Sequence, residues 1–382
     1  MKKIHLKHLR KVEVYVLLEQ RFREQLFTNL FSKFKLKEEA AKAIGLREGY
    51  SLTRYQKGLR FCPLSVLKKI CSILNYDLNN IEGKILEIKQ GSSGKTGLAH
   101  GIKYPKFPYK ESKELAYLIG KFIGDGYIGF NKNNALMISY HNRDEILREK
   151  FKKQAKCFFG NIYLKEYNNN IKLPSIVGFI LLNFCKNFKT FDSEIPSFII
   201  KNKEFNKYFL RAIFEDEGCV YYKKDSRSIS IRMSNSIVIP QIHKMLENIG
   251  IKPNPIRKTK KEKSYIYSFE ITGRENLKKF LKDISFAKDY YKHKKLIDAI
   301  NSYRFHQSRI GESKQNILNQ LKKRSYSTKE LCIILNMKRA NLLQHLAKLE
   351  KEGKIKRYTK KPLQDSKGRL LGNFPHEWKI IK

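Results

Sequence analysis

Two stretches of the sequence end an apolar helical pattern with an acidic residue and a glycine, and they constrain the fold more than any other feature. They are Leu118-Ile-Gly-Lys-Phe-Ile-Gly-Asp-Gly126 and Leu210-Arg-Ala-Ile-Phe-Glu-Asp-Glu-Gly218. A carboxylate is unfavourable at the C-terminal end of a helix, because the last carbonyls already carry partial negative charge. A cation such as Mg2+, which prefers oxygen ligands, would compensate for it. The repeat therefore predicts a cation site at Asp125 and Glu217, although an ordinary helix end explains either copy alone.

The residues around the two motifs repeat as well. After each acid the pattern predicts a β-hairpin, an amphipathic helix entered through Asn142 or Asn235, a second pair of strands and a final helix. These elements are expected at 127–130, 135–140, 146–155, 161–167, 170–173 and 178–186, and again at 219–222, 228–233, 239–249, 254–258, 265–271 and 275–283. Gly126 and Gly218 fit the left-handed conformation that ends a helix, so each chain can turn sharply after its acid.

With this repeat, the chain resembles the LAGLIDADG homing endonucleases, in the form where one polypeptide carries both halves of the enzyme. The resemblance covers residues from about 110 to 305. It implies an α+β fold in which two αββαββα halves form a pseudo-twofold pair and the motif helices pack side by side. The family prefers small residues on the packed helix faces, where this chain has Gly120 and Gly124 in one motif but Ala212 and Asp216 in the other. Asp216 departs from the family pattern.

The resemblance also implies the chemistry of the site. Asp125 and Glu217 would bind Mg2+ (or Mn2+), with Gly124 and Asp216 as further ligands, and two ions about 4 Å apart would assist phosphodiester hydrolysis. A protein with its own dyad can present one acid to each strand of a DNA duplex. The family also places a basic residue near each scissile phosphate, for which Lys292 is the candidate and Lys288 a weaker one. A solvated lysine-rich face is the alternative, and the first half offers no clear equivalent.

The charge of the chain agrees with a polyanionic partner. Its 79 Lys and Arg residues outnumber 36 Asp and Glu, giving a formal net charge of +43 spread along 382 residues. Such a protein binds nucleic acid electrostatically, with an affinity that falls as salt rises. Charge alone does not separate an enzyme from a ribosomal protein or a repressor.

A helix-turn-helix pattern precedes the repeat. Residues 38–44 predict a short helix, Gly45 to Gly49 a turn, and Ser51 the N-cap of a second helix, with a further helix at 64–74. This segment resembles the helix-turn-helix of the phage-repressor family, which lays its second helix in the major groove. A small helical bundle used only for packing is the alternative. The candidate base-reading residues are Arg54, Gln56 and Lys57.

A second DNA-binding pattern follows the repeat. We expect one helix at 313–323, a second that begins at the capping box Ser327-Thr-Lys-Glu330, and a third at 338–351. Strands are expected at 355–358 and 378–381. Residues 311–382 therefore resemble a winged helix, a module that can also dock on proteins. The expected core of its last helix includes Leu342, Leu343, Leu346 and Leu349. The residues expected to face a DNA groove are Lys338, Arg339, Asn341 and His345.

Changes in composition mark the expected domain boundaries. They give a helix-turn-helix domain at 1–90, a linker at 91–110 rich in Gly, Ser and Lys, a first LAGLIDADG half at 111–200, a second half at 201–308 and a winged-helix domain at 311–382. Each half would lay its sheet along the major groove and contact DNA through alternate residues. The candidates are Ser230 and Arg232, or Lys258 and Lys260.

These patterns predict a Mg2+-dependent, site-specific endonuclease that cuts both strands of double-stranded DNA. A non-catalytic DNA-binding transcription regulator on the same scaffold is one alternative, and an RNA maturase is another. We expect a monomeric, cytoplasmic protein that does not bind membranes, since the sequence has no long apolar stretch and its six cysteines include no Cys-x-x-Cys pair.

Overall fold

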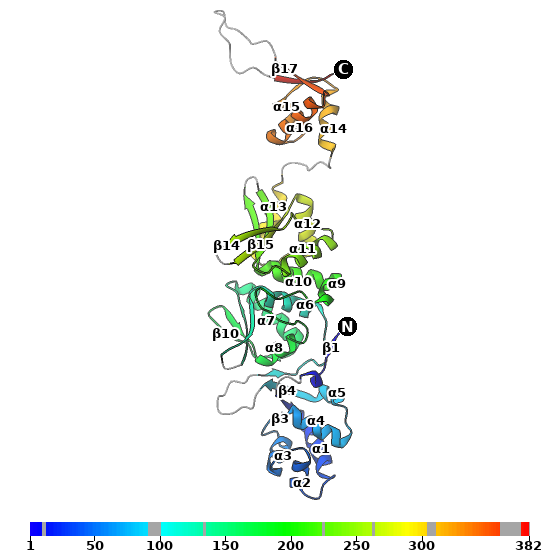
Figure 1. Cartoon of the computed structure of the whole chain (residues 1–382), viewed down its shortest axis with the longest axis vertical. Coiled ribbons are helices and arrows are strands. Elements are labelled where there is room, and N and C mark those ends of the chain that lie inside the picture. Colours follow the sequence, from blue (N-terminus) through cyan, green and yellow to red (C-terminus); the bar gives the residue numbers. More distant parts are fainter. Residues whose placement is uncertain are drawn as a thin grey trace, which may run out of the picture. The chain divides into compact units, whose positions relative to one another are not determined.

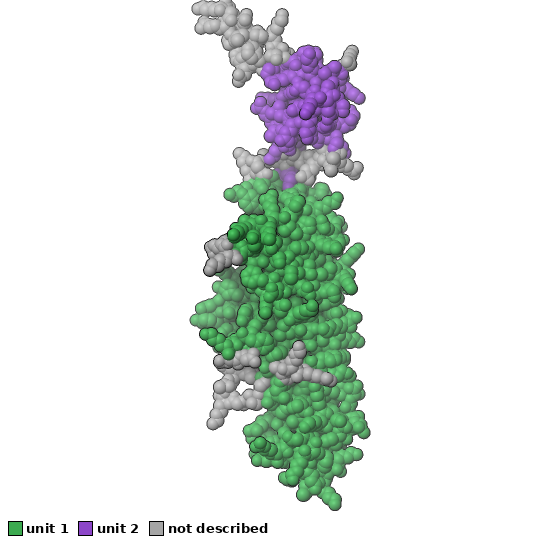
Figure 2. Space-filling model, in the orientation of Figure 1, with its two compact units in different colours: residues 1–298 green, residues 299–382 purple. Residues whose placement is uncertain are grey.

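The computed structural model describes residues 1–9, 13–90, 101–132, 135–223, 226–261, 264–303, 311–359 and 376–381. The chain forms two compact units, Met1–Asp298 and Ala299–Lys382, which are coloured separately in Figure 2. Within the described residues, no helix has both the length and the apolar character needed to cross a membrane.

Two repeats of helices and antiparallel sheet form the centre of the larger unit (Figure 1). The first consists of α6 (Lys113–Ile123), β7 (Gly126–Phe130), β8 (Leu136–His141), α7 (Glu145–Phe159), β10 (Lys165–Tyr167), β11 (Asn170–Lys172) and α8 (Ser175–Leu181). The second consists of α10 (Lys203–Asp216), β12 (Gly218–Lys223), β13 (Ser226–Met233), α11 (Val238–Asn248), β14 (Arg257–Lys261), β15 (Ser264–Thr272) and α12 (Arg274–Asp283). Two further helices are α9 (Ser197–Lys201) and α13 (Tyr291–Asn301).

The two sheets have the same topology. Their strand orders are β7-β8-β11-β10 and β12-β13-β15-β14, so in each the first hairpin is joined to the last strand of the second hairpin. Alternate residues such as Ile138 and Tyr140, or Ile229 and Ile231, are buried against the helices, which is the pattern of a sheet covered on one face. The expected α+β fold with two similar halves is confirmed.

One predicted strand divides into two. Residues 161–167 were expected as a single strand, but only Lys165–Tyr167 pairs with β11 in the repeat. Asn161–Ile162 forms β9, which pairs instead with β5 (Ile102–Lys103) in another sheet. Burial gives the reason, because Ile162 and Ile102 are both buried in that second sheet, whereas β10 is exposed throughout.

The N-terminal region contains the expected helices and shares a sheet with the first repeat. Its elements are β1 (Lys3–Ile4), η1 (Leu6–His8), β2 (Val14–Leu18), α1 (Gln20–Phe31), α2 (Lys37–Ala43), α3 (Gly49–Gln56), β3 (Cys62–Pro63), α4 (Leu64–Leu74), α5 (Leu78–Ile81), η2 (Glu82–Lys84) and β4 (Ile85–Gln90). The five-stranded order β3-β2-β4-β5-β9 runs from this region into the first repeat.

The expected linker 91–110 thus includes paired strands. Besides β5, it contains β6 (Tyr109–Lys110), which pairs with β1. Residues 91–100 lie outside the described part. Ladder hydrogen bonds therefore connect the N-terminal region to the first repeat.

From residue 311 onward, the described part of the smaller unit forms three helices and a three-stranded antiparallel sheet. Its elements are α14 (Glu312–Leu321), β16 (Tyr326–Ser327), α15 (Thr328–Ile334), α16 (Arg339–Lys351), β17 (Ile355–Thr359) and β18 (His376–Ile380). The predicted capping box is present, since Ser327 caps α15 and exchanges hydrogen bonds with Glu330. The order β16-β18-β17 and the helices agree with the expected winged helix. Leu343 departs from its expected core position, because 41% of its surface is exposed.

Candidate active site

The two motif helices place their acids at corresponding positions. Helix α6 ends at Ile123, followed by Gly124 and Asp125, while α10 ends at Asp216 with Glu217 as its C-cap. Each acid is followed directly by the first strand of its repeat, which begins with Gly126 or Gly218.

The reason for these two glycines differs from the prediction. Neither lies in the left-handed region. A Cβ on Gly126 would lie 2.4 Å from the Cα of Phe122, and one on Gly218 would lie 2.4 Å from the carbonyl oxygen of Phe214. Both glycines therefore let the strand pass close to the last helical turn, and this close approach brings each acid to the start of its sheet.

The helices α6 and α10 pack closely through their small residues. A Cβ on Gly120 would lie 2.7 Å from the Cβ of Ala212 and 2.9 Å from the carbonyl oxygen of Phe209. Gly124 faces Asp216 in the same way, because an added Cβ would lie 3.0 Å from both the Cβ and Oδ2 of Asp216. The larger side chain of Asp216 is thus accommodated by the absence of a side chain on Gly124.

This packing brings the two motif acids into electrostatic contact. Burial raises the pKa of Glu217 to about 7, and the nearby charges of Asp125 and Asp216 add to the effect. Burial also raises the pKa of Asp125, although Lys121 and a hydrogen bond from Asn142 oppose the shift. Asn142 Nδ2 lies 2.8 Å from Asp125 Oδ2. Carboxylates whose charged forms are disfavoured in this way are poised to bind a cation.

The two motif acids offer oxygen donors, which both Mg2+ and Mn2+ accept. Among the described residues, no group of three or more His, Cys, Asp or Glu side chains is arranged to hold a metal ion. Mg2+ is usually held by only one or two carboxylates together with water and substrate phosphates. Asp125 and Glu217 are both partly exposed. Whether the carbonyl of Gly124 contributes remains a prediction.

Asp216 does not take the position predicted for a metal ligand. Its side chain is fully buried, and its Oδ1 accepts hydrogen bonds from Lys121 Nζ at 2.7 Å and Tyr140 OH at 2.9 Å. Its Oδ2 has no partner within the described residues and faces Gly124. Burial raises the pKa of Asp216 to about 7 despite the opposing charge of Lys121. Asp216 is therefore an internal partner of Lys121 at the interface between the helices.

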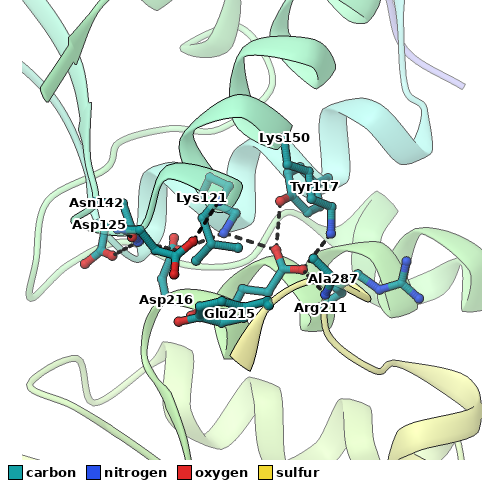
Figure 3. A network of polar contacts seen from close by, with 12 residues as sticks. Tyr117, Lys121, Asp125, Asn142, Lys150, Arg211, Glu215, Asp216 and Ala287 are labelled. Atoms are coloured by element: carbon teal, nitrogen blue, oxygen red, sulfur yellow. Dashed lines mark hydrogen bonds and ion pairs between the residues drawn. The ribbon is translucent and has the colours of Figure 1, made fainter. Parts of the chain in front are cut away.

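A buried ion network surrounds Glu215, which the sequence reasoning did not single out (Figure 3). Glu215 Oε2 accepts a hydrogen bond from Tyr117 OH at 2.7 Å and lies 3.2 Å from Lys121 Nζ. Its Oε1 accepts from Lys150 Nζ at 2.6 Å and from the backbone N–H of Ala287 at 3.0 Å. Burial alone would raise the pKa of Glu215, but Lys121 and Lys150 outweigh it and hold the pKa below its ordinary value. The only sequence signal was the presence of charged residues inside two apolar helical runs.

Lys292 lies beside the second motif, as the sequence reasoning anticipated. Its Nζ donates a hydrogen bond to the backbone carbonyl of Glu215 at 2.7 Å, near the C-terminal end of α10. The side chain is buried, and burial lowers its pKa while the charge of Asp216 opposes the shift. This position favours Lys292 over Lys288, but its catalytic role remains a prediction.

The register of the second sheet separates the predicted DNA contacts into two sets. Ser230 and Arg232 pair with Glu270 and Ser268, whose neighbours along the strand, Phe269 and Ile271, point to the buried side. Ser230 and Arg232 therefore lie on the face away from the core, which Arg257 shares because it also pairs with Ser268.

Lys258 and Lys260 lie on the opposite side of the sheet from Arg232. They pair with Tyr267 and Tyr265, and the ammonium of Lys258 is 4.1 Å from the centre of the Tyr265 ring. The two predicted pairs therefore cannot both contact one groove. The face away from the core, with Arg232 and Arg257, is the candidate DNA-binding face of this sheet.

The helix-turn-helix residues are less exposed than expected. Helix α3 begins at Gly49 with Glu48 as its N-cap, so Ser51 lies within the helix instead of capping it. Lys57 is exposed, but Arg54 and Gln56 are partly buried. The Nε of Arg54 is buried and has no partner in the described part of the chain. Of the three, Lys57 is thus the most accessible to a partner.

Helix α16 of the smaller unit carries the residues predicted to face a DNA groove, and they differ in exposure. Arg339 and Asn341 are exposed on α16, and Lys338 is its N-cap. His345 is partly buried, and its Nδ1 is buried without a hydrogen-bond partner among the described residues, so its place in the groove-facing set stays a prediction.

Comparison with known families identifies two parts of the chain. Residues 204–285 match the family model of the LAGLIDADG-like domain. Residues 312–356 match that of the bacterial regulatory protein, arsR family. These segments correspond to the second repeat and to the helices of the smaller unit.

Curated relatives share only a segment with the chain. It is 26% identical over 268 residues to the glutamine–fructose-6-phosphate aminotransferase of Methanocaldococcus jannaschii, and 28% identical over 197 residues to the replication factor C small subunit of the same organism. It is 23% identical over 222 residues to the DNA polymerase of Thermococcus litoralis. The matches cover 66%, 50% and 54% of this chain but only 22%, 10% and 13% of the relatives. The chain thus spans less than a quarter of their length, and their names give no common activity.

Solved structures with a similar fold share little sequence with the chain. The homing endonuclease I-DmoI in complex with DNA and Mn is 16% identical with a TM-score of 0.35, covering 45% of this chain and 96% of that chain. Full-length DUF199/WhiA from Thermatoga maritima is 12% identical with a TM-score of 0.35, covering 65% and 93%. By the two family matches, the chain carries a LAGLIDADG-like domain and, in its smaller unit, an arsR-type helix-turn-helix.

Proposed function

We propose that this chain is a site-specific, Mg2+-dependent (or Mn2+-dependent) DNA endonuclease that cuts both strands of a long duplex target. One observation carries the proposal. Asp125 and Glu217, from two separate motifs, end a closely packed pair of helices and raise one another's energy as charged groups. Neighbouring carboxylates of this kind destabilise a fold unless a cation joins them, so their presence favours function over packing.

The residues around the acids support a division of roles. Asn142 orients Asp125 through Oδ2, and no hydrogen bond from a described residue occupies the other carboxylate oxygen. The backbone N–H of Glu217 donates to the carbonyl oxygen of Ile213, whereas its carboxylate accepts no hydrogen bond from a described residue. Bound Mg2+ or Mn2+ would supply positive charge to the phosphate oxygens and lower the pKa of an attacking water. Lys292, beside the end of α10, would counter negative charge that develops on the scissile phosphate.

The experiment is cleavage of a plasmid library with randomised inserts, in buffers with Mg2+ or with EDTA. We expect wild type to produce linear DNA with breaks at a defined sequence only when Mg2+ is present. Asp125→Asn and Glu217→Gln should reduce cleavage by about 1,000-fold or more, because each removes a metal-binding charge. Asp192→Asn, which changes an exposed aspartate away from the motifs, should leave cleavage unchanged. Metal-independent cutting, or full activity of Asp125→Asn, would contradict the proposal.

A transcription regulator is the second candidate, favoured by the arsR-type match in the smaller unit. A regulator would bind one duplex sequence tightly and release it intact. Capture of fragments from the same library by the full-length protein in EDTA, followed by incubation with Mg2+, distinguishes the two functions. Captured DNA that stays uncut supports the regulator, and captured DNA that is cut supports the nuclease.

A further inference from the structure

The two motifs differ at one pair of positions, and the difference places a buried ion pair on one side of the dyad only. Lys121 in the first motif corresponds to Ile213 in the second, and Gly124 corresponds to Asp216. Lys121 therefore meets Asp216 across the helix pair, whereas the matching positions on the other side are Ile213 and Gly124. A lysine and an aspartate that occupy facing positions suggest a coupled role.

The environment of Lys121 requires both partners in the second repeat. Its side chain is fully buried, with Nζ 2.7 Å from Asp216 Oδ1 and 3.2 Å from Glu215 Oε2. The ammonium also lies 5.4 Å and 5.7 Å from the ring centres of Tyr117 and Tyr140. Burying a charge is costly, and hydrophobic residues of similar volume commonly give equal or greater stability. Stability alone is thus a weak reason for this lysine.

A short chain of hydrogen bonds connects Lys121 to the proposed catalytic acid (Figure 3). Asn142 Nδ2 donates to Asp125 Oδ2 at 2.8 Å and lies 3.3 Å from Asp216 Oδ1, the same oxygen that accepts from Lys121. The amide of Asn142 is itself oriented, since its Oδ1 accepts a hydrogen bond from the backbone N–H of Asp144 at 2.9 Å. Lys121 thus pairs with Asp216, and Asp216 accepts a hydrogen bond from the Asn142 amide. The same amide donates to Asp125 and so orients its carboxylate.

The side-chain amide of the corresponding asparagine in the second repeat donates to a different residue. Asn235 also accepts backbone hydrogen bonds at the start of its helix, from Ile237 and Val238 at 2.8 Å. Its Nδ2, however, donates to the Oγ and the carbonyl oxygen of Ser193, both at 3.0 Å. Glu217 therefore receives no amide from Asn235, and the two acids are held unequally.

We propose that Lys121 is a positioning residue for Asp125, acting through Asp216 and Asn142, and that it makes the two half-sites inequivalent. The inference rests on the proposed endonuclease function. The strand cut with Asp125 depends on Lys121, while the strand cut with Glu217 does not. Because the ammonium lies at the helix interface, the second repeat controls the geometry of an acid in the first.

The test compares Lys121→Met with Lys150→Met in the full-length protein. Lys150 is the matched control, because it also pairs with Glu215 but has no ion pair or hydrogen bond with Asp216 or Asn142 among the described residues. With a duplex labelled separately on each strand, we expect Lys121→Met to slow cleavage of one strand by about tenfold or more and the other by less than about threefold. Nicked duplex should accumulate. Lys150→Met should affect both strands equally.

Binding of Mn2+ alone, followed by electron paramagnetic resonance, gives a readout that does not require cleavage. Removing a positive charge near the site would strengthen Mn2+ binding if electrostatics alone mattered. If the loss of Lys121 misplaces Asp125, the Lys121→Met variant should instead bind Mn2+ severalfold more weakly than wild type does. Lys150→Met should bind Mn2+ as well as wild type or better.

A double variant separates positioning from folding. Lys121→Met leaves Asp216 buried without the cation that pairs with it, so it should lower the melting temperature, whereas Lys121→Met/Asp216→Ala removes both charges and should recover it. The double variant should keep the strand defect and the weaker Mn2+ binding. Equal slowing of both strands, or unchanged or tighter Mn2+ binding by both variants, would overturn the inference. A wild type that cuts neither strand would instead count against the proposed function, and Mn2+ affinity would still decide the role of Lys121.

Discussion

The carboxylate of Glu217 is held where its charge is unfavourable. Burial and the neighbouring charges of Asp125 and Asp216 raise its pKa to about 7, so the folded protein binds a proton there more tightly than the unfolded chain does. A group of this kind contributes stability below its unfolded pKa, and the contribution is lost as the pH rises through the folded value. At neutral pH without metal, the burial of the Glu217 carboxylate therefore lowers the free energy of unfolding.

Glu217→Gln should therefore stabilise the protein at high pH. The glutamine has no charge to bury, so in EDTA the variant should exceed wild type at pH 8 by about 1–3 kcal/mol, at roughly 1.4 kcal/mol per unit of pKa shift with allowance for partial exposure. The difference should shrink toward zero near pH 4, where wild type is protonated in both states. Thermal unfolding between pH 4 and 8 measures it. Glu24→Gln, on an exposed part of α1, is the control and should show no such trend.

At the scale of elements, the close contact of α6 with α10 sets the geometry of the site. Two glycines of α6, Gly120 and Gly124, face Ala212 and Asp216, and an added Cβ at Gly120 would approach a backbone oxygen as well as a side chain. Backbone cannot move aside as a flexible side chain can. The separation of the helices, and with it the separation of the two acids, therefore depends on these small residues.

Gly120→Ala should force the helices apart. We expect a loss of about 1–3 kcal/mol of unfolding free energy, because interior overpacking of one methyl costs about that much. Cleavage should fall on both strands, because both acids move. Gly83→Ala is the control, since a Cβ there would meet no atom within 4 Å. A variant with wild-type stability and activity would show that the interface tolerates a wider spacing.

Particular residues show how far the sequence could predict these elements. The acid–glycine repeat located Asp125 and Glu217, and the capping box located the start of α15, because both signals are local. Lys121 was not predictable, since its burial depends on which side chains α10 brings against it. The face of Lys258 could not be predicted for a related reason: the pairing register of β14 decides it, and a shift of one residue reverses it.

At the scale of the whole molecule, the excess of basic residues must be placed on particular faces to be useful. The net charge of +43 gives general attraction to DNA, and the sheet register decides which side chains lie on the candidate DNA-binding face. Arg232 and Arg257 lie on that face, while Lys258 and Lys260 lie on the other. The two pairs have equal charge, which makes them a matched comparison.

Arg232→Ala/Arg257→Ala should weaken DNA binding more than Lys258→Ala/Lys260→Ala. If both arginines contact phosphates, the dependence of log Kd on log salt should become shallower by about 2 for the arginine pair. The lysine pair should change it by less than about 0.5, through long-range attraction alone. Titration of the library-selected duplex at several salt concentrations in EDTA measures both. Equal effects of the two pairs would show that the total charge, and not the face, determines affinity.

The sheet β3-β2-β4-β5-β9 has a consequence for how a target would be measured along DNA. A helix-turn-helix joined to its neighbour by a flexible linker can bind DNA sites at various distances from the cleavage site. Here, backbone hydrogen bonds fasten the N-terminal region to the first repeat. In the proposed complex, the number of base pairs between the site contacted by α3 and the bond cut near Asp125 would therefore be constant.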